Sequence, residues 1–171
     1  MATAGKNLSE YNKAKMPNAE NMVFGIVVSE WNESITEGLC KGAIDTLLEN
    51  NVAQENIDRL DVPGSYELTY GAQHMVNTNK YDAVIVIGSV IQGETKHFDF
   101  VCQGVTNGIS HLNATQNIPV IFCVLTDNTM QQAIDRSGGI HGNKGTEAAV
   151  AAIRMAEIKV RSHKPNGEIG F

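Results

Sequence analysis

Three short stretches of the chain are almost continuously apolar. They are residues 22–28, the stretch between Asp82 and Gly88, and residues 118–125. Apolar runs of this length predict strands that are buried on both faces, as in a parallel sheet. A fourth and weaker strand pattern covers residues 57–62. Together the four stretches predict the sheet at the centre of the protein.

The intervals between these strands carry the spacing of helices. Apolar side chains recur at every fourth position from Ile35 to Leu47, which predicts a helix over residues 34–49. Further helices are predicted over residues 65–76, 98–112 and 144–159, and a T-x-x-Q capping sequence predicts a short one from Thr129 to the glycines at 138–139. The alternation predicts an α/β fold: a three-layer αβα sandwich around a mostly parallel sheet of about four or five strands.

Length and composition indicate how the chain is divided. A chain of 171 residues is long enough to form one domain with its own core, without a metal or a disulfide. The polar N-terminal segment, residues 1–20, is expected to be a flexible tail. The domain is expected over residues 21–160, and residues 161–171 form a polar C-terminal tail.

Charge and cysteine usage exclude several classes of protein. The net charge of −6 argues against a nucleic-acid partner, and no apolar window is long enough to span a membrane or to act as a signal peptide. Cys40, Cys102 and Cys123 are isolated, and each falls in an apolar helix or strand pattern. Isolated buried thiols are typical of a reducing compartment, so we expect a cytoplasmic protein with no metal site.

Candidate chemistry lies where the expected strands end. Residues 93–97, GETKH, join the third strand to its helix. In open α/β sheets ligands bind at such turns, because helix N-termini point free N–H groups there. This turn offers a hydroxyl, an ammonium group and the imidazole of His97, whose ordinary pKa of about 6.5 suits proton transfer. A lone histidine at a helix start is also commonly a surface residue.

Two further strand ends carry side chains with more than one interpretation. Trp31, the only tryptophan, follows the first strand. Its position is equally compatible with a packing residue at the rim and with a platform on which a flat ligand stacks. Glu67 follows the second strand. Its position is compatible with a carboxylate in the first turn of a helix, where the helix dipole favours it, and with an acceptor of hydrogen bonds from substrate hydroxyls.

A glycine-rich connection, residues 138–145, has a cation at each end. Arg136 suits the C-terminus of its own helix, and the glycines suit a turn. Arg136 and Lys144 in an acidic protein also suit anion capture, since a guanidinium binds phosphate bidentately. Residue type and spacing therefore indicate a flat polar ligand that bears phosphate, together with one proton shuttle.

Five motifs, in their order and separation, resemble the lumazine synthase family of riboflavin biosynthesis. They are VVSEWN, VPGSYE, GSVIQGETKHFDFV, VLTDNTxxQAxDR and GNKG, and the resemblance covers about residues 22–158. It implies a flavodoxin-like sandwich that forms homopentamers, with the sites at subunit interfaces. It also implies the condensation of 5-amino-6-(D-ribitylamino)uracil with 3,4-dihydroxy-2-butanone 4-phosphate to 6,7-dimethyl-8-ribityllumazine, with release of phosphate and water and without a cofactor.

The resemblance assigns a role to each matching position. His97 resembles the proton donor, and Trp31 the aromatic that stacks on the pyrimidine. The other positions that resemble the pyrimidine and ribityl site are Ser65, Tyr66 and Glu67, the backbone edge of Ser89, Val90 and Ile91, and Phe122 from the neighbouring subunit. Those that resemble the phosphate site are Glu94, Thr95 and Arg136, with Lys144 also from the neighbouring subunit.

Assembly stays open at this point. Glu30 and Gln92 stand where arginine is frequent in the family, and Ile140 where lysine is, which lowers the positive charge near the phosphate site. The connection from Arg136 to Lys144 lacks an insertion found in several members that stop at the pentamer. A pentamer, a sixty-subunit icosahedral shell and a partnership with riboflavin synthase are all compatible with the sequence.

Two other classes of protein share parts of this pattern. A flavodoxin-like FMN carrier shares the sheet, but its hydroxyl-rich phosphate loop should stand where the chain has SEWNES after the first strand. A non-catalytic shell or flavin-storage protein needs Trp31 and the interfaces but neither His97 nor Arg136. A dithionite-reducible flavin identifies the first class, and turnover with both substrates separates the enzyme from the second.

Overall fold

The computed structural model describes residue 7 and residues 9–163, and its elements alternate as predicted. The main strands are β1 (Phe24–Ser29), β2 (Ile57–Val62), β3 (Ala83–Ile91) and β4 (Val120–Asp127). The helices are α1 (Glu33–Glu49), α2 (Leu68–Asn77), α3 (His97–Thr115), α4 (Met130–Arg136) and α5 (Lys144–His163). Short 3₁₀ turns are η1 (Lys13–Lys15), η2 (Gln54–Asn56) and η3 (Ser65–Glu67), and a small ribbon pairs β5 (Ser137–Gly139) with β6 (Gly142–Asn143).

The four main strands form one parallel sheet in the order β2-β1-β3-β4. The predicted fold class, an αβα sandwich on a parallel sheet, is confirmed. Because all four strands run the same way, their carboxyl ends lie along one edge. Ser29, Val62, Ile91 and Asp127 end the strands there.

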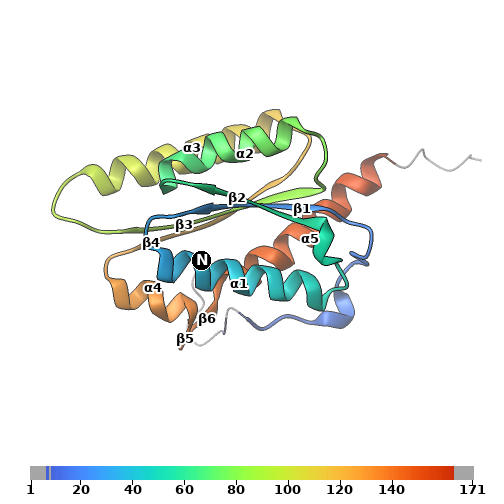
Figure 1. Ribbon diagram of the computed structural model, residues 1–171, viewed down its shortest axis with the longest axis horizontal. Coiled ribbons are helices and arrows are strands. Elements are labelled where there is room, and N and C mark those ends of the chain that lie inside the picture. Colours follow the sequence, from blue (N-terminus) through green and yellow to red (C-terminus); the bar gives the residue numbers. More distant parts are fainter. Residues whose placement is uncertain (1–6, 8, 164–171) are drawn as a thin grey trace, which may run out of the picture.

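Helices cover both faces of the sheet, with α2 and α3 on one side and α1, α4 and α5 on the other (Figure 1). Successive residues of a strand point to opposite faces. Accordingly Ile85 and Ile87 pack with the α1 and α5 side, whereas Val84 and Val86 pack with the α2 and α3 side. Burial on both faces explains why these strands read as continuous apolar runs.

The start of α4 follows the capping sequence. The Thr129 hydroxyl accepts a hydrogen bond from the Gln132 N–H at 3.3 Å. The Gln132 side chain reaches back one residue further than in the usual capping box, and its Oε1 accepts from the Asn128 N–H at 2.9 Å. Both hydrogen bonds hold the β4–α4 turn, which orients the helix that carries Arg136.

The glycine-rich connection is a small β-ribbon rather than a plain turn. Its anchor is Asn143, whose Nδ2 donates to the Gly38 carbonyl of α1 at 2.8 Å and whose Oδ1 accepts from the Gly145 N–H at 2.8 Å. A Cβ on Gly42 would lie 2.4 Å from the Asn143 side chain, so α1 needs glycine at this contact. The ribbon therefore fixes the separation of Arg136 and Lys144.

The segment before β1 lies against the domain. Ala19 is fully buried, Met16 packs against the core, and the Tyr11 hydroxyl donates to Glu49 at 3.2 Å and accepts from Asn50 at 3.0 Å. The sequence predicts a flexible tail over residues 1–20, because too few apolar residues occur there to form a pattern. Residues 1–6 and 8 lie outside the described residues. So do residues 164–171 of the expected C-terminal tail, while α5 itself continues to His163.

Candidate active site

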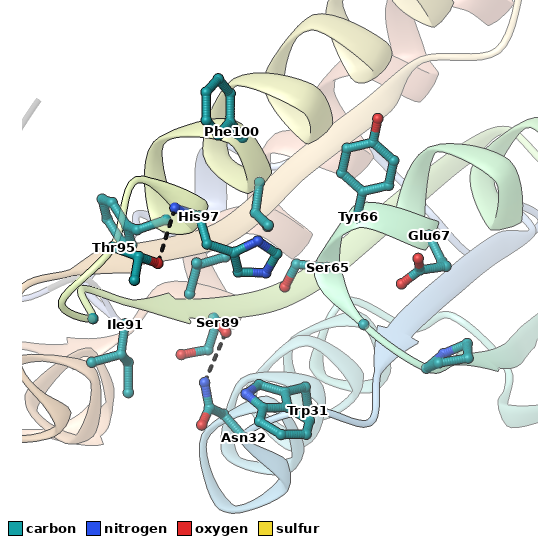
Figure 2. A pocket seen from close by; sticks show the side chains of 16 residues that line it. Trp31, Asn32, Ser65, Tyr66, Glu67, Ser89, Ile91, Thr95, His97 and Phe100 are labelled. Carbon is teal, nitrogen blue, oxygen red and sulfur yellow. Dashed lines mark hydrogen bonds between the residues drawn. The ribbon is translucent and has the colours of Figure 1, made fainter.

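A pocket of about 820 Å³ opens at the carboxyl ends of β1, β2 and β3 (Figure 2). Its walls come from three segments that are far apart in the sequence, because the parallel sheet brings their strand ends together. The lining residues are Trp31 and Asn32 after β1; Pro63, Gly64, Ser65, Tyr66 and Glu67 after β2; and Ser89, Val90, Ile91, Gly93, Thr95, His97, Phe98, Phe100 and Val101 from β3 to α3.

Most of the site residues expected from the sequence meet in this pocket. Nine line it: Trp31, Ser65, Tyr66, Glu67, Ser89, Val90, Ile91, Thr95 and His97. Four do not line it within this chain: Glu94, Phe122, Arg136 and Lys144. The nine pocket residues suit the binding of a flat polar ligand and the donation of a proton to it. Three of the four residues outside the pocket are charged, which suits the binding of a phosphate.

His97 is the first residue of α3, and its side chain faces the pocket (Figure 2). Its backbone N–H donates to the Thr95 hydroxyl at 3.3 Å, which closes the β3–α3 turn. The imidazole is exposed to solvent. A side chain at this helix start is suited to donating a proton to a ligand held at the strand ends.

Trp31 is 71% exposed in this chain. Tryptophan is a large apolar side chain that usually gains from burial, so an exposed indole at a pocket mouth marks a binding surface. Tyr66 and Phe100, which are also exposed, line the same pocket. Three aromatic faces around one opening suit a planar heterocycle.

Ser65 and Ser89 contribute buried hydroxyls to the pocket. Within the described residues, neither Oγ has a hydrogen-bond partner. Both hydroxyls are buried behind the pocket wall, so these two serines contribute to the shape of the cavity. Figure 2 shows Ser65 beside His97, and Ser89 beside Asn32.

Asn32 is a pocket residue that the sequence analysis missed. Its backbone is left-handed (φ 62°), and its Nδ2 donates to the Ser89 carbonyl at 2.9 Å. Asparagine is one of the few residues that adopt this conformation readily, and its place between a strand and a helix was the available signal. The contact ties the β1–α1 turn, and with it Trp31, to the end of β3.

Replacing Asn32 with alanine should lower the free energy of unfolding by about 1–3 kcal/mol, because it removes a hydrogen bond and strains the left-handed backbone. Asn32→Gly is the matched control, since glycine relieves the strain but also lacks the hydrogen bond. Thermal and urea unfolding of both variants measures the two contributions. Equal losses for alanine and glycine would mean that backbone conformation plays no part.

Gly88 lets β3 approach the η3 turn closely. A Cβ at this position would lie 2.6 Å from the Ser65 Oγ and 2.9 Å from the Leu68 Cδ1. The backbone of Gly88 therefore helps to set where the pocket wall from Ser65 to Glu67 stands.

Gly88→Ala should push that wall outward and raise KM for a ligand bound against Ser65 by about tenfold, as small displacements of positioning groups commonly do. Gly25→Ala is the control, because a Cβ there would lie 2.6 Å from the Met75 Sδ, at the amino end of β1 and outside the pocket. Steady-state kinetics on both variants provides the measurement. A KM for Gly88→Ala equal to that of Gly25→Ala would remove Gly88 from this role.

Arg136 lies at the end of α4 and holds contacts within its own chain. Its Nη1 donates to the Gln132 carbonyl at 2.8 Å, and its Nε lies 3.8 Å from the Asp127 Oδ1. The first contact is the helix C-terminal interaction that the sequence left open. Lys144, at the start of α5, pairs with Glu147 at 2.7 Å.

Phe122 lies on β4, an edge strand of the sheet, and is partly exposed there. Glu94 stands in the exposed β3–α3 loop beside pocket residues. Neither side chain lines the cavity of the same chain.

The described residues hold no group of three or more metal-ligating side chains, and none of their helices is both long and apolar enough to cross a membrane. The three cysteines are unpaired, and burial raises the pKa of the Cys123 thiol to about 12. Cys40 is also buried, and its pKa is likewise raised by desolvation. Neither of these two thiols lines the pocket.

Comparison with known proteins agrees with this geometry. The family model of 6,7-dimethyl-8-ribityllumazine synthase matches residues 21–160, which include the whole pocket. The chain belongs to the 6,7-dimethyl-8-ribityllumazine synthase family. The resemblance inferred from the five motifs is thereby confirmed.

Several proteins named 6,7-dimethyl-8-ribityllumazine synthase are similar over most of their length. The one from Flavobacterium johnsoniae is 67% identical over 93% of this chain and 84% of its own. The one from Flavobacterium psychrophilum is 61% identical over 95% and 86%. The one from Porphyromonas gingivalis is 54% identical over 93% and 99%. The similarity to these lumazine synthases covers the sheet, the pocket and the β5–β6 ribbon of this chain.

Proposed function

We propose that the chain condenses 5-amino-6-(D-ribitylamino)uracil with 3,4-dihydroxy-2-butanone 4-phosphate, and that the pocket at the strand ends binds the pyrimidine. The observation that carries the proposal is the meeting of Trp31, Ser65, Ser89 and His97 around one cavity. Trp31 offers a stacking face and His97 an imidazole, and the two serines shape the wall between them. They match a planar polar substrate whose reaction moves protons.

The uracil ring would lie along the open edge of β3. Pairing between β1 and β3 ends at Val28 and Ile87, whereas β3 remains paired with β4 as far as Ile91. Alternate residues of a strand direct their backbone groups to the same side. The Ser89 carbonyl is turned to the β1 side, where it meets Asn32, so Ile91 presents its N–H and carbonyl on that side too. Donor and acceptor groups on this edge suit the edge of a uracil.

The ribityl chain would extend toward Glu67. This carboxylate is exposed, lines the pocket and makes no hydrogen bond or ion pair within the described residues. A free carboxylate accepts hydrogen bonds from sugar hydroxyls, and such charge-assisted bonds are stronger than neutral ones. The Glu67 role as an acceptor therefore fits better than a purely electrostatic role at the helix start.

The reaction needs positioning more than a protein nucleophile. The substrate's 5-amino group attacks the butanone carbonyl and water leaves, which forms an imine. Elimination of phosphate then leaves a new carbonyl group after tautomerisation. The ribityl-bearing nitrogen attacks this carbonyl to close the ring, and a second water leaves. His97 would transfer protons at these steps, while orientation of two bound substrates supplies most of the acceleration.

The phosphate site would be completed by a second copy of the chain. Thr95 and Glu94 lie on the β3–α3 loop of one copy, and Arg136, Lys144 and Phe122 would come from its neighbour. Two observations support this: those three residues lie outside the cavity of their own chain, and the cavity mouth exposes aromatic side chains. We expect a homopentamer, either alone or as part of a sixty-subunit shell with riboflavin synthase as partner, in the cytoplasm.

Turnover with both substrates tests the proposal. Purified protein should form 6,7-dimethyl-8-ribityllumazine and release phosphate in equal amounts, and omission of either substrate should abolish both signals. Binding of the pyrimidine without turnover would indicate a storage or shell protein instead. Light scattering on the same sample separates a pentamer from a shell.

A further inference from the structure

Asp127 is a buried carboxylate that the proposed reaction does not use. It ends β4, is only 8% exposed, and its Oδ2 has no hydrogen-bond partner within the described residues. Burying a carboxylate without full pairing is unfavourable. Burial raises the pKa of this carboxyl, and the nearby Arg136 opposes the shift. A carboxylate that is buried although its burial is unfavourable suggests a functional role for Asp127.

The position of Asp127 links the pocket to Arg136. Its backbone pairs with Ile91, a pocket residue, and its carbonyl accepts from the Gln92 N–H at 2.9 Å. Its carboxylate Oδ1 lies 3.8 Å from the Arg136 Nε. Asp127 therefore stands between the strand end that carries the pocket and the helix that carries the cation.

The guanidinium of Arg136 contacts its own chain through two of its three nitrogens. Nη1 donates to the Gln132 carbonyl at 2.8 Å, and Nε forms an ion pair with Asp127 at 3.8 Å. Within the described residues Nη2 makes no hydrogen bond, and the side chain is 31% exposed. Nη2 is therefore the nitrogen left for an anion from outside the chain.

We propose that Asp127 is a positioning residue that holds the Arg136 guanidinium with its Nη2 edge turned out toward a phosphate group. The inference rests on the phosphate role of Arg136 in the proposed function. A separation of 3.8 Å leaves Asp127 close enough to orient the cation by charge and too buried to meet the anion itself. Loss of this restraint lets the arginine side chain sample other rotamers, so phosphate binding then has to order it.

The competing explanation is a purely structural ion pair that stabilises the end of α4. In that case replacing Asp127 changes thermal stability but leaves phosphate affinity unaffected. A double-mutant cycle separates the two, because positioning requires that the effect of Asp127 vanish once Arg136 is gone.

The experiment measures binding of inorganic phosphate by titration calorimetry to the whole protein and to Asp127→Asn, Arg136→Ala and the double variant. KM for the butanone phosphate is measured alongside. Asp135→Asn is the matched control, since it also removes one negative charge near Arg136, from the α4 helix that carries this arginine. Asp127→Asn is nearly isosteric, and Asp127→Ser repeats the cycle if the first variant does not fold.

Asp127→Asn should weaken phosphate binding and raise KM by about threefold to tenfold, within the range of coupling between contacting groups. It should leave kcat nearly unchanged and add nothing in the Arg136→Ala background, and Asp135→Asn should weaken neither quantity. Unchanged or tighter phosphate binding by Asp127→Asn, an equal effect without Arg136, or no phosphate binding by the unaltered protein would overturn the proposal. The protein could also bind phosphate with coupling between Asp127 and Arg136 but fail to condense the two substrates. That result would support the positioning role of Asp127 and contradict the proposed function.

Discussion

Replacing His97 with alanine should lower kcat by about 10²-fold, the lower end of the usual range for a general acid or base. The effect is limited because the nucleophile belongs to the substrate and orientation remains intact. KM for both substrates should change little, since Trp31, Tyr66 and Phe100 still line the pocket. Steady-state kinetics with each substrate varied in turn measures the three constants.

His111→Ala is the matched control, because His111 is an exposed histidine on the same helix and does not line the pocket. It should leave kcat unchanged. Complete loss of turnover in His97→Ala, with both substrates still bound, would make the imidazole indispensable and so contradict catalysis that depends mainly on positioning. An unchanged kcat would remove His97 from the chemistry.

Replacing Arg136 with alanine should raise KM for the butanone phosphate by about 10- to 100-fold, since a hydrogen bond to a charged group contributes roughly 1.5–3 kcal/mol. KM for the pyrimidine should stay within about twofold, because the aromatic and backbone contacts of that substrate do not involve the cation. Arg136→Lys should give a KM for the butanone phosphate between those of the unaltered protein and Arg136→Ala, because an ammonium group is charged but lacks the bidentate geometry.

Arg154→Ala is the control for loss of a positive charge, since Arg154 is an exposed arginine on α5 that does not line the pocket. It should leave both KM values unchanged. If Arg136→Ala behaves like Arg154→Ala, the phosphate is bound elsewhere, and the charged residues of the β3–α3 loop become the first candidates.

The sheet was predictable from sequence because its physical cause is local and strong. A strand buried on both faces must be apolar at every position, and Ile85, Val86 and Ile87 satisfy both layers of helices. The start of α4 was predictable for a similar reason, because Thr129 and Gln132 satisfy free N–H groups within a few residues.

Other features depend on contacts between distant segments and left no pattern. The β5–β6 ribbon depends on Asn143 reaching the Gly38 carbonyl, which no periodicity reveals. The packing of residues 9–20 depends on single contacts such as Tyr11 with Asn50. Asn32 was missed because its left-handed backbone becomes meaningful only beside the end of β3.

The site itself was predictable in part. Strand ends of a parallel sheet must meet, so Trp31, Glu67 and His97 were expected to share a cavity, and they do. Arg136 and Lys144 lie outside that cavity. Their role depends on assembly, which is a property of surfaces rather than of local spacing.

A site shared between copies is the central claim, and mixing two impaired variants tests it most directly. His97→Ala and Arg136→Ala chains are produced together so that they assemble at random, and turnover is measured at low butanone phosphate. If each site takes His97 from one copy and Arg136 from the next, about one quarter of the interfaces are intact, and activity should rise toward about a quarter of the unaltered level. Activity that stays at the mean of the two variants would place both residues in a site within one chain and contradict the account.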